Sequence, residues 1–123
     1  MKVISDTVHG ILDYLTVAIF ALAPSILGLT GFAALASYAL AAIHLAMTLL
    51  TNMPLGVIRV IPMRLHALVE MLVGPILVVA ALALPTMFGD RREFFLVMGL
   101  VILAVWLLSS YGRPVVAGPT RST

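Results

Sequence analysis

The chain has 123 residues, of which 63% are hydrophobic and only 10% are charged, and its mean hydropathy is +1.20. A water-soluble domain is about 45–50% apolar and about 25% charged, so this composition excludes an ordinary soluble globule and predicts a protein embedded in a lipid bilayer. The net charge is +2, but the seven Lys and Arg residues form no basic stripe, which argues against nucleic acid as a partner. The chain contains no cysteine, which excludes disulfides and thiolate metal sites.

Four apolar segments are long enough to cross the hydrocarbon core as helices, for which about 20 residues are needed. They cover about residues 8–28, 33–52, 63–85 and 93–111. Helices are favoured over strands because each spanning segment must satisfy its own backbone hydrogen bonds in lipid. The sequence therefore predicts an all-α, four-helix transmembrane bundle in a single domain of residues 1–123, with a flexible tail at about 113–123.

The breaks between these segments carry Pro and Gly residues. The stretch "PSILGLTG" (24–31) ends the first segment, and "TNMPLGVIRVIP" (51–62) separates the second from the third. Near the fourth, Asp90 and Glu93 have the spacing of a helix N-cap and its partner three residues on. At the N-terminus, polar residues lie where a signal peptide needs its apolar region, so we expect the first helix to be retained.

The two halves of the chain resemble each other. His9 and Asp13 in "VHGILDY" (8–14) match His66 and Glu70 in "LHALVEM" (65–71), 57 residues later. The pairs "PSILG" and "PTMFG", and "LLTN" and "LLSS", follow in the same order at offsets of 61 and 58. This order predicts a duplication, with one repeat at about 1–56 and the other at about 57–112. Because each repeat has two helices, both repeats start on the same side of the membrane and are parallel.

The distribution of Lys and Arg predicts the orientation. Five cations lie on the face that both termini share with the central loop, against two on the opposite face, Arg91 and Arg92. The five are Lys2, Arg59, Arg64, Arg113 and Arg121. By the positive-inside rule, both termini are predicted to be cytoplasmic.

The order of these motifs resembles that of the SPW-repeat family of small bacterial integral membrane proteins. The matching stretches are "HGILDY", "APSILG", "LLTN", "VIPMRLHALVE" and "LPTMFG", which cover most of residues 1–111. The signature tryptophan is absent from both repeats, where Ser25 and Thr86 stand instead. The resemblance implies a multi-pass, four-helix protein of the bacterial inner membrane. It implies no catalytic residue, because the family has no established biochemical activity.

The candidate functional residues are the two His–acid pairs and one further histidine. Residues four apart share a helix face, so His9 can point with Asp13, and His66 with Glu70. His44 lies roughly 12 Å from the end of the second predicted helix, at 1.5 Å per residue. These five side chains could converge in one polar site near the cytoplasmic side. Such a site could hold zinc, iron or manganese, bracket a haem iron between His9 and His66, or relay protons. Alternatively, the pairs bond locally and hold the helix starts together.

The sequence contains no phosphate loop, nucleophile elbow or dinucleotide fingerprint, so no catalytic residues and no catalysis are predicted. The first functional prediction is a structural or accessory subunit that packs against other membrane subunits or against itself. The second is a haem- or metal-binding redox protein that uses the candidate cluster. The third is a transporter or channel, which would need an oligomer because four helices make a small pathway.

Overall fold

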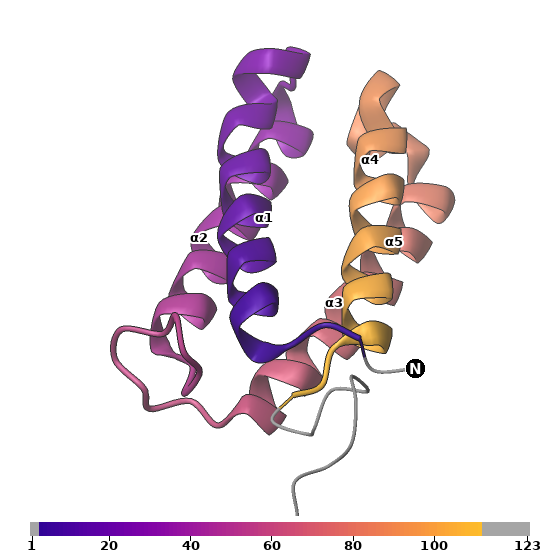
Figure 1. Ribbon diagram of the computed structural model, residues 1–123. Coiled ribbons are helices and arrows are strands. Elements are labelled where there is room, and N and C mark those ends of the chain that lie inside the picture. The colour runs from indigo at the N-terminus through magenta and orange to yellow at the C-terminus, as the bar shows by residue number, and fades with distance from the viewer. Residues whose placement is uncertain (1–2, 112–123) are drawn as a thin grey trace, which may run out of the picture.

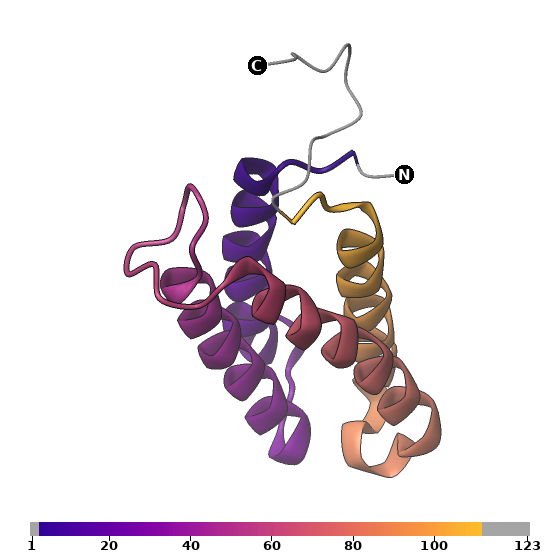
Figure 2. The ribbon, with the colours of Figure 1, turned by 90° about the horizontal axis from the view of Figure 1, so that it is seen from below.

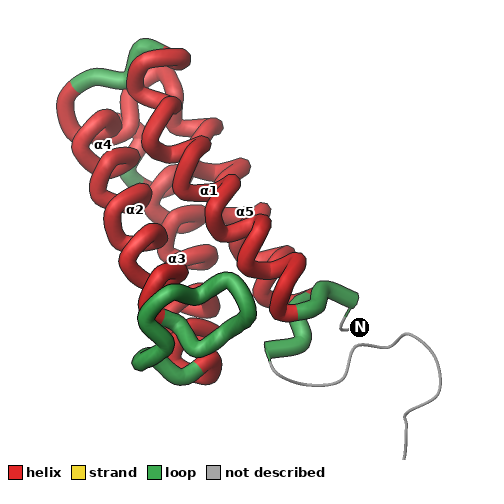
Figure 3. The backbone as a smooth tube through the Cα atoms, turned by 60° about the vertical axis from the view of Figure 1, so that its left-hand side comes forward, coloured by secondary structure: helices red, strands yellow, loops and turns green. Residues whose placement is uncertain are grey.

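The computed structural model describes residues 3–111, and the predicted tail at 113–123 lies outside this range. Its helices are α1 (Asp6–Leu27), α2 (Gly31–Leu50), α3 (Met63–Ala83), the single turn α4 (Pro85–Phe88), the 3-10 turn η1 (Gly89–Arg91) and α5 (Arg92–Leu108). The described residues form no β-strand, only two isolated bridges (Figure 3). The prediction of an all-helical protein is therefore confirmed.

Three of the helices are long and apolar enough to cross a membrane: α1 with 22 residues, α2 with 20 and α3 with 21. This supports the prediction of a membrane protein. The fourth long helix, α5, has 17 residues and ends at Leu108, earlier than the predicted end near residue 111. The last predicted turn does not form, because Ser109 adopts an extended backbone and the Ser110 N–H bonds to Ile4 in the N-terminal segment.

The helices form two hairpins. In Figure 1, α1 lies along α2, and α3 lies along α5. Gly28 ends α1 in the left-handed conformation, with φ of 67°, and its N–H bonds to the Pro24 carbonyl. In the second hairpin α3 and α5 approach closely, because a Cβ atom added to Gly99 would lie only 2.9 Å from the Gly74 carbonyl oxygen. Any side chain at Gly99 would push these two helices apart.

Aromatic side chains pack the two hairpins against each other. Phe20 of α1 meets Phe94 of α5 edge to face, with ring centroids 5.8 Å apart. Phe32 of α2 meets Phe88 of α4 in the same way at 5.5 Å. Around Phe20, Phe88 and Phe95 lies the buried core, which otherwise consists of aliphatic residues and methionine. The apolar core thus occupies the half of the bundle near the α1–α2 turn.

At the other end of the bundle, the ends of α2 and α5 are tied down by extended segments. Figure 2, seen from below, shows the N-terminal segment running from α1 to the end of α5. There the Ser110 N–H donates to the Ile4 carbonyl at 2.8 Å. In the loop after α2, the Asn52 N–H donates to the Ile61 carbonyl at 2.8 Å. These two bridges hold Ser109 and Thr51, which immediately follow α5 and α2, at the same end of the bundle as the starts of α1 and α3.

The prediction that Asp90 caps the fourth helix is wrong. Asp90 lies inside η1, and the residue that precedes α5 is Arg91, without a capping hydrogen bond from its side chain. An N-cap residue needs an extended backbone just before the helix. Gly89, with φ of 62°, turns the chain early, so Asp90 is already part of a helical turn.

Candidate metal centre

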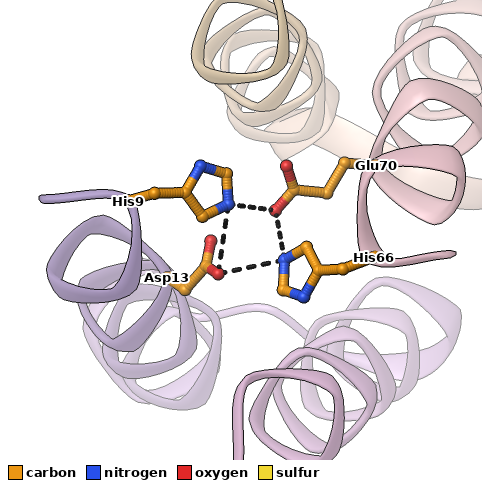
Figure 4. A group of neighbouring side chains, drawn as sticks. All are labelled: His9, Asp13, His66 and Glu70. Carbon is orange, nitrogen blue, oxygen red and sulfur yellow. Dashed lines mark hydrogen bonds and ion pairs between the residues drawn. The ribbon is translucent and has the colours of Figure 1, made fainter. Parts of the chain in front are cut away.

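Four side chains from α1 and α3 meet between the two hairpins (Figure 4). His9 and Asp13 project from one face of α1, and His66 and Glu70 from one face of α3. Each residue contributes one potential ligand atom, and these atoms all lie within 4.8 Å of one another. The four residues are between 0 and 3% exposed. The structure therefore brings the two His–acid pairs together in a single buried group, called the His–acid cluster below.

Within the cluster each imidazole contacts both carboxylates. His9 Nε2 lies 3.3 Å from Asp13 Oδ2 and 3.1 Å from Glu70 Oε1. His66 Nε2 lies 3.1 Å from Asp13 Oδ2 and 2.9 Å from Glu70 Oε1. The two nitrogen and two oxygen atoms therefore surround a common centre, with imidazole and carboxylate alternating.

Hydroxyl groups at the helix ends determine which ring nitrogen of each histidine carries a proton. Ser109 Oγ lies 2.6 Å from His9 Nδ1, and Thr51 Oγ1 lies 2.7 Å from His66 Nδ1. Each hydroxyl donates its own hydrogen to the backbone carbonyl four residues earlier: Ser109 donates to Val105, and Thr51 donates to Met47. Each hydroxyl oxygen must therefore accept from Nδ1–H, so Nδ1 is protonated in both histidines. The Nε2 atoms then face the centre of the cluster, as ligands to a metal ion do when Nδ1–H bonds to an outer partner.

Asp13 is the member of the cluster with an oxygen that accepts no hydrogen bond from the described residues. Its Oδ2 atom is buried and, within residues 3–111, accepts no hydrogen bond. The two Nε2 atoms lie at ion-pair distance from it, at 3.3 and 3.1 Å, but neither makes a hydrogen bond to it. A buried acceptor without a hydrogen bond costs about 1–3 kcal/mol. A cation at the centre of the cluster would remove that cost.

Tyr111 completes the surroundings of Glu70. Its phenol donates a hydrogen bond to Glu70 Oε2, and its ring meets the His9 ring edge to face at a centroid distance of 5.0 Å. Burial, followed by the negative charge of Glu70, raises the pKa of the Tyr111 phenol above its usual value. The phenol is therefore a neutral donor at physiological pH. It holds Glu70 so that Oε1 faces the centre.

His44, the fifth residue of the predicted cluster, is not among the four that surround the centre. It is buried, at 7% exposure. It borders a cavity of about 20 Å³ with His66 and Glu70, and another of about 10 Å³ with Asp13 and Glu70. His44 thus lies next to the His–acid cluster on its deeper side.

Sequence reasoning missed the outer partners of the cluster. Thr51 and Ser109 occupy matching positions in "LLTN" and "LLSS", so the internal repeat offered a signal for them. No comparable signal existed for Tyr111, which in the sequence resembles an ordinary interfacial aromatic residue.

The cluster offers two imidazole nitrogens and two carboxylate oxygens. This donor set suits Zn²⁺, Mn²⁺ or Fe²⁺ and, without sulfur, is unlike a site for Cu⁺. The protonated Nδ1 atoms and the phenol on Glu70 supply the outer hydrogen bonds that orient such ligands. In comparisons with known proteins, no family model, curated protein or solved structure matches the chain.

Proposed function

We propose that this chain is a membrane protein that binds one divalent transition-metal ion, with His9, Asp13, His66 and Glu70 as its ligands. The observation that carries this proposal is the convergence of four buried donor atoms, of which Asp13 Oδ2 has no hydrogen-bond partner. The metal would be Zn²⁺, Mn²⁺ or Fe²⁺, since all four donors are nitrogen or oxygen. The ion would be held between α1 and α3 and would join the two hairpins.

The geometry favours a bare ion over haem. A haem iron held by two histidines needs the porphyrin plane between the two imidazoles. Here the carboxylate oxygens of Asp13 and Glu70 lie within 3.3 Å of both Nε2 atoms. They occupy the space that the porphyrin would need.

A purely structural tie between the hairpins is less well supported. Burying a pair of charges costs about as much free energy as their attraction returns, and apolar packing of similar volume often stabilises more. Ionisable groups inside a membrane are therefore functional candidates by default. The Asp13 oxygen adds to this argument because it accepts no hydrogen bond from residues 3–111, whereas a tie built for stability would leave no acceptor unsatisfied.

Asp13→Asn is expected to weaken metal binding at least a hundredfold. Loss of an outer-shell partner alone costs about 10–100-fold in affinity, and the neutral amide removes a negatively charged ligand. Titration calorimetry of the purified protein with Zn²⁺, Mn²⁺ and Fe²⁺ (the last without oxygen) measures the effect. The matched control is Asp90→Asn, which changes an exposed aspartate at the other end of the bundle. Equal affinities of the two variants, or no binding by the folded wild-type protein, would overturn the proposed function.

The same proposal includes four membrane spans arranged as two parallel repeats. It is supported by the paired contacts of the cluster, in which His9 and Ser109 correspond to His66 and Thr51. The parallel bridges Ile4–Ser109 and Thr51–Ile61 correspond in the same way. As the fourth span, α5 would cover about 25 Å at 1.5 Å per residue, which is at the lower end for crossing helices.

The orientation can be tested with single cysteines, because the native chain has none. The two positions to substitute are Asn52 and Asp90, which are exposed and lie at opposite ends of the bundle. In intact cells a membrane-impermeant maleimide should label Asp90→Cys at once, and Asn52→Cys only after permeabilisation. The reverse pattern would contradict the cytoplasmic termini, and labelling of both from one side would contradict the four spans.

Membership of the SPW-repeat family, location in the bacterial inner membrane and an accessory role beside other membrane subunits stay predictions. So does an oligomeric transporter. The metal-binding proposal depends on none of them. Each is compatible with it, because the ion would lie inside one chain, between its two hairpins.

A further inference from the structure

A large pocket lies next to the His–acid cluster, at the end of the bundle that carries the N-terminal segment. It measures about 880 Å³ and is bordered by the start of α3, the end of α5 and residues 109–111. Its polar lining includes Asp6, Asn52, Arg64 and Ser110, and its apolar lining includes Trp106. The pocket is open to the surroundings and large enough for a hydrated metal ion.

Two residues line this pocket and also touch the cluster. Ser109 accepts the His9 Nδ1–H, and Tyr111 donates to Glu70. The barrier between the pocket and the ligands is therefore a single layer of side chains. On the deeper side, next to His44, the cavities of about 20 and 10 Å³ have room for about one water molecule each, for which about 10–15 Å³ is needed. A hydrated ion fits on the pocket side and not on the His44 side.

We propose that this pocket is the entrance through which the metal ion reaches the cluster, and that Tyr111 is the residue that closes it. The proposal rests on the proposed metal-binding function. With ligands no more than 3% exposed, an ion needs an opening to enter, and Tyr111 is the side chain whose displacement would uncover both His9 and Glu70.

The backbone of Tyr111 is suited to such a displacement. Its φ is +49°, a left-handed conformation that is unfavourable for a non-glycine residue. Opening would therefore relax backbone strain while it breaks the single hydrogen bond from the phenol to Glu70. Because Tyr111 follows the end of α5, it can move without disturbing a helix.

The first test changes the closing residue and the entrance separately. Tyr111→Ala should speed the loading of Zn²⁺ into metal-free protein at least about tenfold, since it removes a barrier worth at least about 1.4 kcal/mol, including a hydrogen bond to a charged group. A bulky maleimide attached to Asn52→Cys should slow loading by a similar factor. The same label on Asp90→Cys, at the far end of the bundle, is the matched control and should leave the rate unchanged. Stopped-flow mixing with a Zn²⁺-sensitive dye measures all rates, and circular dichroism checks that each variant keeps its helices.

The second test needs no metal. Diethyl pyrocarbonate acylates accessible imidazoles, and mass spectrometry locates the modified histidine. In metal-free protein Tyr111→Ala should accelerate modification of His9 several-fold and leave His44 unchanged. If the wild-type protein binds no metal, the proposed function fails, and this test alone decides whether Tyr111 closes the entrance. The proposal is overturned if Tyr111→Ala changes neither Zn²⁺ loading nor His9 modification, or if the label on Asn52→Cys does not slow loading.

Discussion

Glu70→Ala is expected to destabilise the metal-free protein by about 3–5 kcal/mol, the usual cost of breaking a buried ion pair by removing one partner. Glu70 Oε1 lies 3.1 Å from His9 Nε2 and 2.9 Å from His66 Nε2, and Oε2 accepts a hydrogen bond from Tyr111. Without Glu70, two imidazoles and a phenol lose their common partner in a buried site. Unfolding in mixed detergent micelles, followed by circular dichroism, measures the difference in free energy.

The matched control is Glu93→Ala in the first turn of α5. Glu93 is exposed, and surface substitutions of this kind change stability by about 0.5 kcal/mol or less. If Glu70→Ala and Glu93→Ala unfold alike, the cluster does not join the two hairpins in the way described above.

Zn²⁺ at about one hundred times its dissociation constant is expected to stabilise the wild-type protein by about 2.7 kcal/mol, because an ion that binds only the folded chain shifts the equilibrium by mass action. Thermal unfolding in detergent, with and without excess EDTA, measures this shift. His66→Ala removes a ligand and should abolish most of the stabilisation. His44→Ala should keep it, because His44 lies beside the four ligands and not among them.

This pair of histidine variants distinguishes a four-residue site without His44, as in the structure, from the five-residue cluster that the sequence predicts. Loss of the shift in His44→Ala alone would place the ion on the deeper side of the cluster. If both variants keep the Zn²⁺-dependent stabilisation, the ion binds elsewhere on the protein.

Much of the fold could be predicted from hydropathy, because a lipid solvent demands long apolar helices and permits few alternatives. The first and last residues of the helices were less predictable. Helix α5 ends early because Ser109 is extended and Ser110, the next residue, bonds to Ile4 in a distant part of the chain. Similarly, the early turn at Gly89 removed Asp90 from its expected capping position. The contact between Ser110 and Ile4 leaves no trace in local periodicity, and periodicity does not show where a glycine will adopt a positive φ.

The site could be predicted in part. Spacing by four placed His9 with Asp13, and His66 with Glu70, because it determines which residues share a helix face. It does not determine how one helix is rotated against another. Only the structure shows that the two pairs face each other. The position of His44 beside the four ligands depends on the same rotation. Tyr111 reaches Glu70 only because its left-handed backbone turns it back toward the bundle.

X-ray absorption at the zinc edge of the Zn²⁺-loaded protein tests the central claim most directly. The account predicts about one ion per chain, with nitrogen and oxygen ligands at about 2.0–2.2 Å and the outer-shell scattering of two imidazoles. In His9→Ala and His66→Ala the imidazole scattering should fall by half or disappear with the bound ion. A shell of oxygen atoms without imidazole scattering, or a spectrum unchanged in both variants, would contradict a metal centre built from His9, Asp13, His66 and Glu70.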